Sequence, residues 1–251
     1  MAAYKRIILK LSGEALKSEG DLFDFDKIRE TADMIRRITE MGIEVGIVIG
    51  AGNIWRGRQG PSANMDAVIA DQMGMLGTVI NCLCMSDALR QASVDCVVQS
   101  AVDMDRFCEP FNAVAARRHL AAGRVVLFAA GSGNPFFSTD TAVALRAVEI
   151  QADAIMMAKN IDGVYTADPA KDPTATLIPV VEEITPAVVA LAGGKGSDLG
   201  TGGMATKLKA ARIATLAGVD MVIANGAPPS LLYGIVEGQP VGTRFVGRKE
   251  G

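Results

Sequence analysis

Histidine, cysteine and aromatic residues are scarce in this chain. Its 251 residues include one histidine, four cysteines and only 5% aromatics. The cysteines lack the paired spacing of a zinc site, and the one histidine, His119, does not lie near them in the sequence. We therefore expect reduced thiols, as in cytosolic proteins, and a core built from aliphatic side chains. The cysteines are Cys82, Cys84, Cys96 and Cys108.

Long basic runs and long apolar runs are also missing. The net charge of −3 and the pI near 5.3 give bulk nucleic-acid binding no electrostatic support. No apolar run approaches the ~18 residues of a membrane span. The N-terminal stretch Met1–Leu16 carries charges inside its apolar part, unlike a signal peptide. These absences predict a soluble cytoplasmic protein with no membrane or nucleic-acid partner.

Short apolar runs alternate with longer helical patterns along the chain. This alternation predicts an α/β fold, with a mainly parallel sheet sandwiched by helices. Strands are expected at Arg6–Leu11, Ile43–Ile49, Cys96–Gln99, Val125–Ala129, Ala154–Met157 and Met221–Ala224. Helices are expected at Phe25–Met41, Asp66–Arg90, Phe111–Ala121, Thr139–Gln151 and Met204–Leu216. Two stretches predict exposed connections: Thr166–Thr176, with its two prolines, and the glycine-rich Gly193–Gly203.

Glycine-rich turns follow several of the predicted strands. Parallel sheets bind ligands beyond the carboxyl ends of their strands, so these turns are candidate site elements. Glycine allows the backbone to approach an anion, and a helix N-terminus offers unpaired N–H groups. Nearby lysine or arginine adds full charge. The turns are Lys10–Gly13, Gly50–Asn53 before Arg56, Gly131–Pro135, and Thr201–Gly203 before Lys207 and Lys209.

Two common nucleotide-binding motifs are absent. No GxxxxGK[ST] pattern occurs, since Gly194-Lys195 is followed by Gly196, so the chain is not a P-loop enzyme. Gly50-Ala51-Gly52 could begin a dinucleotide fingerprint, but Trp55 stands where a small residue must pack. Phosphate binding is therefore expected without either motif.

Several segments resemble those of the bacterial uridylate kinase family within the amino-acid-kinase superfamily. They are KLSGEAL at Lys10–Leu16, GAGNIWRG at Gly50–Gly57, ADQMG at Ala70–Gly74, GSGNPFFSTDTAVALRA at Gly131–Ala147 and IDGVYTADP at Ile161–Pro169. The resemblance covers roughly the first two-thirds of the chain. It implies the amino-acid-kinase (carbamate-kinase-like) fold and conversion of UMP and ATP to UDP and ADP with Mg²⁺.

The last third is instead similar to glutamate 5-kinase, another member of that superfamily, chiefly in the run GTGGMATK at Gly200–Lys207. The chain therefore reads as a mosaic, with an acceptor lobe at 1–168 and an ATP lobe at 169–251 in one continuous catalytic domain. Two alternatives to a UMP kinase follow: a glutamate 5-kinase, and a folded nucleotide-binding chimera with little activity.

The resemblance implies roles for individual residues. At the phosphates and adenosine of ATP it places Lys10, Leu11, Ser12, Gly13, Gly52, Arg56, Asn160, Tyr165, Asp168, Thr201, Gly202, Gly203 and Lys207. Around UMP it places Ala51, Asp71, Ser132, Gly133, Asn134, Pro135, Phe136, Phe137, Ser138 and Thr139. Asp71 is expected to bind the ribose. Ala51 stands where the family has glycine, which puts the close approach of that backbone in question.

The catalytic group is expected to be Lys10, Asp140 and Lys207. Phosphoryl transfer needs in-line positioning and neutralisation of spreading charge, which two lysines on either side of the phosphoryl group supply. The resemblance to the superfamily implies that Asp140 orients both ammonium groups, although aspartate is also a common helix N-cap. No residue is assigned as a metal ligand.

The resemblance also implies a homo-oligomer, a hexamer in that family, with GTP and UTP as effectors. Ser18–Phe23 matches the segment linked to GTP activation and is equally consistent with a plain surface loop. The apolar stripe Ile69, Met73, Leu76, Ile80 and Leu83 on the long central helix is a candidate contact face, or a face that packs on the sheet.

Overall fold

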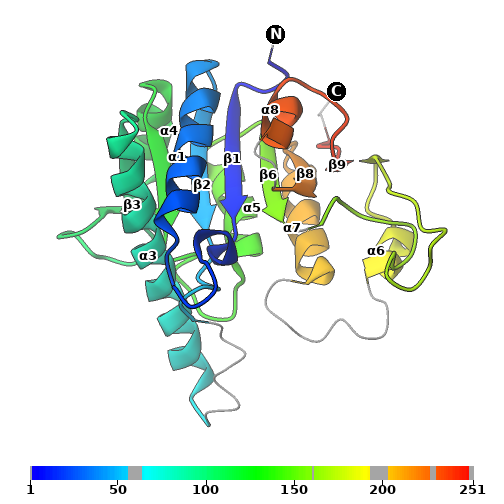
Figure 1. Cartoon of the computed structure of the whole chain (residues 1–251), viewed down its shortest axis with the longest axis horizontal. Helices are drawn as coiled ribbons and strands as arrows, with labels where there is room; N and C mark the ends of the chain where they lie inside the picture. Colours follow the sequence, from blue (N-terminus) through cyan, green and yellow to red (C-terminus); the bar gives the residue numbers. More distant parts are fainter. Residues whose placement is uncertain (1, 56–63, 160, 193–202, 227–229, 249–251) are drawn as a thin grey trace.

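The computed structural model of this chain describes residues 2–55, 64–159, 161–192, 203–226 and 230–248. Over these ranges the chain forms a nine-stranded sheet with helices on both faces (Figure 1). The strands are β1 Arg6–Leu11, β2 Glu44–Ile49, β3 Cys96–Ser100, β4 Glu109–Pro110, β5 Val125–Ala129, β6 Ala154–Lys159, β7 Val180–Val181, β8 Asp220–Asn225 and β9 Thr243–Phe245. The helices are the 3₁₀ turn η1 Gly13–Leu16, then α1 Phe25–Glu40, α3 Ala67–Gln91, α4 Ala113–Ala121, α5 Thr139–Glu149, α6 Pro186–Ala192, α7 Met204–Leu216 and α8 Ser230–Val236.

The sheet is mainly parallel, as the sequence predicts. Its strand order is β4-β3-β5-β2-β1-β6-β8-β9-β7, and among the described pairs only β8 and β9 run antiparallel. β1 lies between β2 and β6 and is buried on both faces: Ile7 and Leu9 point to one core, and Ile8 points to the other. Burial on both faces explains why the strand sequences are continuous apolar runs.

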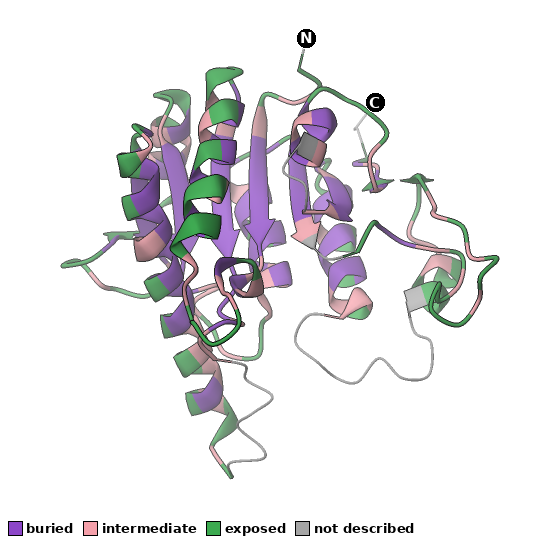
Figure 2. Cartoon of the chain, in the orientation of Figure 1, coloured by how far each residue is buried: buried purple, intermediate pink, exposed green. Residues whose placement is uncertain are grey.

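The helices form two layers, one on each face of the sheet. One core contains side chains of α1, α3 and α8, and the other contains side chains of α4, α5 and α7. Figure 2 shows the consequence, with the central strands buried and the outer helix surfaces exposed. All four cysteines are free thiols, and burial raises the pKa of Cys82 far above its ordinary value.

Polar residues fix where the helices begin. Asp24, Asp66, Asn112 and Ser138 each accept a hydrogen bond from a backbone N–H in the first turn of the helix that follows. The start of α5 is therefore as predicted. The start of α4 is two residues later than predicted, because Asn112 is the cap and Phe111 precedes the helix.

The expected connection at Thr166–Thr176 is an exposed loop whose ends are tied together. The Thr166 backbone N–H donates to the Thr176 carbonyl at 2.9 Å, and Tyr165 bridges to Leu177. The sheet continues across this point, since β6 before the loop pairs with β8 after it. The predicted loop Gly193–Gly203 lies outside the described residues, except for Gly203.

Helix α3 is the longest helix of the described chain, and the large apolar side chains that it buries in the core lie in its second half. Cys82, Met85 and Leu89 are fully buried, whereas Ile69, Met73, Leu76 and Ile80 are exposed. The first half extends past the edge of the sheet where the strands end (Figure 1). By length and hydropathy, α3 is the one described helix that could cross a membrane, but its second half belongs to the core. The interpretation that the predicted stripe packs on the sheet is therefore wrong for these four residues, whereas Leu83, the fifth, packs against the core.

Candidate active site

The carboxyl ends of β1, β2 and β5 meet at one edge of the sheet. Because these strands are parallel and adjacent, the turns that follow them lie side by side. In Figure 1 this is the lower edge, where the strand arrows end and η1 lies. Three of the four predicted glycine-rich turns, Lys10–Gly13, Gly50–Asn53 and Gly131–Pro135, are thus brought to a common edge.

Lys10, Asp140 and Lys207 form a buried ionic cluster at this edge. Lys10 is the penultimate residue of β1, Asp140 lies in the first turn of α5, and Lys207 lies in the first turn of α7. The Lys10 Nζ is 3.1 Å from Asp140 Oδ1, and the Lys207 Nζ is 3.4 Å from Asp140 Oδ2. Their side chains are 4%, 1% and 3% exposed. One carboxylate therefore holds two ammonium groups, leaving the cluster with a net positive charge.

Asp140 does not cap α5. The cap is Ser138, whose hydroxyl accepts from the Thr141 N–H, while the Asp140 side chain points into the cluster. Thr206, on the first turn of α7, adds a third contact: its Oγ1 lies 2.9 Å from Asp140 Oδ2 and 2.8 Å from the Gly203 carbonyl. Thr206 lies within the stretch Thr201–Lys207 that the resemblance places around the ATP phosphates, but its contact with Asp140 was not predicted.

The electrostatics of the cluster lower the pKa of Lys207. Burial is the main cause, because it disfavours the charged ammonium form. The nearby charge of Lys10 lowers the pKa further, and Asp140 opposes both effects. A second anionic group, such as a phosphate, would balance the remaining positive charge of the two lysines.

The first two turns are packed directly against each other. A Cβ on Gly13 would lie 2.4 Å from Asn53 Oδ1 and 2.5 Å from the Gly50 carbonyl oxygen, so only glycine fits there. The methyl group of Ala51 is turned toward α3, where a Cβ on Gly77 would lie 2.9 Å from it. The extra methyl group at Ala51 is thus accommodated by the helix.

Residues 130–138 form the loop between β5 and α5. Gly131, Gly133 and Phe136 have positive φ, of 60°, 84° and 68°. The Phe136 backbone N–H donates to Asp71 Oδ2 at 2.5 Å, so this carboxylate ties α3 to the loop. Phe136 and Phe137 are exposed beside it. The other members of this predicted set are Asn134, Pro135, Ser138, which caps α5, and Thr139, which is its first residue. The Ser132 hydroxyl donates to the Asn134 carbonyl at 3.2 Å within the loop and accepts from the Asn134 N–H at the same distance.

The predicted adenosine-side residues are spread over the β6–β8 part of the edge. The Tyr165 hydroxyl donates to Asp162 at 3.2 Å, and Asp168 pairs with Lys171 at 3.2 Å within its own exposed loop. Gly203 is the N-cap of α7, close to Lys207. Arg56, Asn160, Thr201 and Gly202 lie outside the described residues.

Asn81 and Thr78 of α3 also contact the turns, and neither was predicted. The Asn81 side chain donates to the Gly50 carbonyl at 2.8 Å, and Thr78 Oγ1 accepts from the Ala130 N–H at 2.9 Å. The available signal was the presence of two polar residues three positions apart, Thr78 and Asn81, in the otherwise apolar middle of the helix. It marks the α3 face opposite the exposed stripe.

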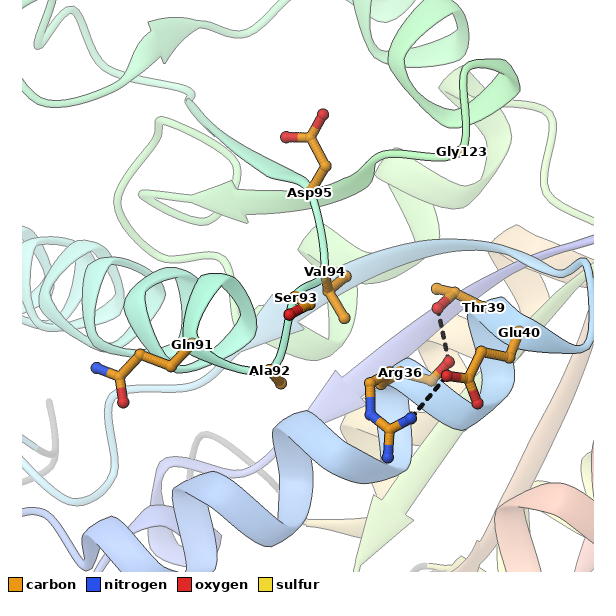
Figure 3. Close-up of a pocket in the computed structure, with 9 residues that line it drawn as sticks. All are labelled: Arg36, Thr39, Glu40, Gln91, Ala92, Ser93, Val94, Asp95 and Gly123. Atoms are coloured by element: carbon orange, nitrogen blue, oxygen red, sulfur yellow. Dashed lines mark hydrogen bonds and ion pairs between the residues drawn. The ribbon is translucent and has the colours of Figure 1, made fainter.

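A pocket at the opposite edge of the sheet is a separate feature (Figure 3). It is lined by the ends of α1 and α3 and by residues just before β3 and β5. Arg36 pairs there with Glu40 at 2.6 Å, and Asp95 pairs with Arg124 at 2.7 Å. Because its charges are paired locally and the pocket is remote from Lys10, it offers no phosphate site.

Comparison with known proteins supports the fold described above. The family model described as the amino acid kinase family matches residues 5–225. Among solved structures, UMP kinase from Bacillus anthracis has a TM-score of 0.85 at 32% identity, covering 98% of this chain and 97% of that chain. UMP kinase from Ureaplasma parvum has a TM-score of 0.82 at 32% identity, with 96% and 98% coverage. Uridylate kinase from Archaeoglobus fulgidus, at 24% identity and a TM-score of 0.70, covers 96% of this chain and 99% of its own, and shares the fold.

These matches extend through the last third of the chain as well as the first two-thirds. They provide no support for a mosaic of two families, and none for glutamate as the phosphate acceptor.

Proposed function

The chain belongs to the amino acid kinase family, and from this membership we propose that it transfers the γ-phosphoryl group of ATP to UMP, giving ADP and UDP. The observation that carries the proposal is the buried cluster of Lys10, Asp140 and Lys207, at an edge where glycine-rich turns converge. UMP as acceptor is supported by the likeness to UMP kinases over nearly the whole chain.

The residues of the cluster suit in-line phosphoryl transfer. A UMP phosphate oxygen forms a bond to the γ-phosphorus while the bond to the ADP oxygen breaks on the opposite side. Lys10 and Lys207 neutralise the negative charge on the transferring group, and Asp140 keeps both ammonium groups in place before the substrates arrive. The water-poor setting strengthens these interactions, because all three side chains are buried.

We assign UMP to residues 1–168 and ATP to residues 169–251, within one catalytic domain. ATP fits the second part because α7 begins directly after its N-cap Gly203 and presents its N-terminal N–H groups beside Lys207. Mg²⁺ bound to ATP would supply further neutralising charge. The described ranges contain no group of three carboxylate, histidine or cysteine side chains suited to a metal ion, so we assign no metal ligand to the chain.

The proposal extends to the setting of the enzyme. We place it in the cytoplasm, in pyrimidine nucleotide synthesis, as a homo-oligomer with GTP and UTP as effectors. The exposed apolar stripe of α3 supports assembly, since it is a face that another copy of the chain can cover.

The test is a coupled ADP-release assay with UMP, CMP, dUMP and glutamate offered in parallel. UMP is expected to give the highest kcat/KM. The value for dUMP should be at least about tenfold lower, because loss of the ribose hydroxyl leaves a polar partner in the site unpaired. Higher activity with glutamate than with UMP would refute the proposal.

A further inference from the structure

Two buried amides, Asn53 and Asn81, form a closed pair beneath the second glycine-rich turn. Asn81 is 0% exposed and Asn53 is 7% exposed. Asn53 Nδ2 donates to Asn81 Oδ1 at 3.0 Å, and Asn81 Nδ2 donates back to Asn53 Oδ1 at 2.8 Å. The remaining amide hydrogens go to the carbonyls of Leu22, at 3.0 Å, and Gly50, at 2.8 Å. Every amide hydrogen of the pair therefore has an acceptor.

The pair joins separate parts of the chain at one point. Asn81 comes from the middle of α3, Asn53 from the turn after β2, and Leu22 from the segment that leads to α1. Asn53 is also the residue against which Gly13 packs without room for a methyl group. The position of the pair thus sets the distance between the turn at Gly50–Asn53 and the turn at Lys10–Gly13.

The hydrogen bonds between the two amides fix the geometry of the turn more than they add to stability. A buried amide pair contributes little more net stability than apolar side chains of the same size, because both amides give up their hydrogen bonds to water. What the amides add is geometry, since each bond fixes a distance and an angle in the turn.

We propose that Asn81, acting through Asn53, is a positioning residue that fixes the separation of the two turns facing the reacting phosphates. This inference rests on the proposed function, because in-line transfer is what makes the separation matter. A misplacement of about 1 Å in such a site lowers the rate by about 100-fold.

The decisive variant is Asn81→Asp, which keeps the size of the side chain and exchanges the NH₂ donor for oxygen. Ionised, the new carboxyl faces two acceptors, the Gly50 carbonyl and Asn53 Oδ1. Protonated, it regains one donor, and burial raises the pKa of such a group. At about pH 8 we expect the kcat of Asn81→Asp to be about tenfold or more below that of wild type, with smaller changes in KM. At about pH 6 the ratio of its kcat to the wild-type kcat should be at least about threefold higher than at about pH 8.

Two further variants control the experiment. Ser86→Ala removes another buried polar group of α3, whose hydroxyl donates to Leu83 within the helix, and should keep the wild-type pH profile. Asn53→Asp removes the donors from the other side of the pair. It should show the same recovery at low pH, and it replaces Asn81→Asp if that variant does not fold.

The outcomes separate the inference from the proposed function. A pH profile of Asn81→Asp parallel to that of wild type, or a loss seen only in melting temperature, overturns the positioning role. Absence of activity in the wild-type chain overturns the proposed function instead. In that case the readout is the rise in melting temperature that ATP causes. If this rise is smaller in Asn81→Asp than in wild type at about pH 8 and equals that of wild type at about pH 6, the positioning role is supported. If the rise in Asn81→Asp does not depend on pH, the positioning role is contradicted.

Discussion

At the scale of single residues, the main feature is one carboxylate shared by two lysines. Asp140 is the one residue of the predicted site for which the sequence allowed two roles, a cap or a charge partner. The structure assigns the cap to Ser138 and leaves Asp140 between Lys10 and Lys207. The three residues were predictable because they lie in segments that resemble known kinases, at the end of a strand and in the first turns of two helices. The contact of Thr206 with Asp140 and the contacts of Asn81 were missed, because the sequence does not show which distant groups a hydroxyl or an amide on a helix will meet.

Removing members of the cluster should lower turnover more than affinity. Lys10→Ala and Asp140→Asn are each expected to reduce kcat by about 100-fold, because preorganised charge is lost from the transition state. The double variant should lose less than the product of the two effects, since the residues act as one unit. Steady-state kinetics with ATP and UMP measure this, with Lys5→Ala, an exposed lysine before β1, as the control. Full independence of the two effects would contradict the shared cluster.

Lys207 should give the enzyme an alkaline limit. Its pKa is lowered, chiefly by burial, so it loses its charge at a lower pH than an ordinary lysine, and kcat should fall there. Lys207→Arg should show no fall of kcat in this pH range, because the guanidinium group stays protonated, although we expect the kcat of this variant to be lower than that of wild type. Asp140→Asn should move the fall of kcat to lower pH, since the Asp140 carboxylate raises the pKa of Lys207. Lys209→Arg, at an exposed position of α7, is the control for the kcat–pH profile.

The lowered pKa of Lys207 also makes the free energy of unfolding depend on pH. Between the lowered pKa of Lys207 and its ordinary value, the unfolded chain binds more protons than the folded chain. The contribution of this residue to the free energy of unfolding therefore rises with pH through that window. Denaturant titrations of wild type and Lys207→Met across alkaline pH measure the difference.

Gly77 and Ala51 should behave as a compensating pair. Gly77→Ala improves helix propensity, but its methyl group would meet Ala51 at 2.9 Å, and overpacking of this kind costs about 2 kcal/mol. Because Ala51 lies in a site turn, kcat should fall as well. Adding Ala51→Gly removes the opposing methyl group and should restore both activity and melting temperature. If the single variant is as stable and active as wild type, the contact is not as tight as the structure shows.

At the scale of elements, the long strands and helices were predictable and the short ones were not. β1, β5 and α7 have the predicted bounds, because each is a continuous apolar or helical pattern between polar or glycine residues. β4, β7 and β9 have two or three residues, too few for any period to show, and they form through pairing with distant strands. The short helices α6 and α8 were missed for the same reason.

Helix α3 has a buried face and an exposed face, and the hydrophobic pattern of the sequence alone did not show which face is buried. Gly77, Asn81 and Cys82 face the body, whereas Ile69, Leu76 and Ile80 are exposed. The buried face uses small and polar residues because it must approach the turns closely. The sequence left open whether the apolar stripe is a contact face or packs on the sheet, and in the structure Ile69, Leu76 and Ile80 are exposed.

The exposed stripe predicts a defined change in assembly. Leu76→Glu places a charge in the middle of it and should convert an oligomer into smaller species, because the charge would be desolvated against a second copy. Light scattering at micromolar protein measures the mass. Gln72→Glu, at an exposed position on the same helix outside the stripe, should leave the mass unchanged. A wild-type monomer would reject assembly through this face.

At the scale of the whole molecule, the sheet unites the two parts that the sequence divided. β6 belongs to the first part and β8 to the second, yet their residues pair from Ala154 with Asp220 to Lys159 with Asn225. α5 and α7 likewise pack in the same core on the same face. The sequence indicated the type of sheet through its alternation of elements. It could not show the strand order, which depends on pairings between residues far apart in the chain.

During synthesis, β1 leaves the ribosome long before β6, the strand that completes its second side, and α7 follows later still. Strands β1, β2, β5 and β3 can pair with each other while the rest of the chain is still being made. At that stage Lys10 and Asp140 are present, but the second ammonium group of the cluster has not been translated. A nascent or truncated chain can therefore pair these strands and yet lack Lys207, which lies in α7. Under the proposed function, the pair of lysines around the phosphoryl group is complete only after translation has passed Lys207.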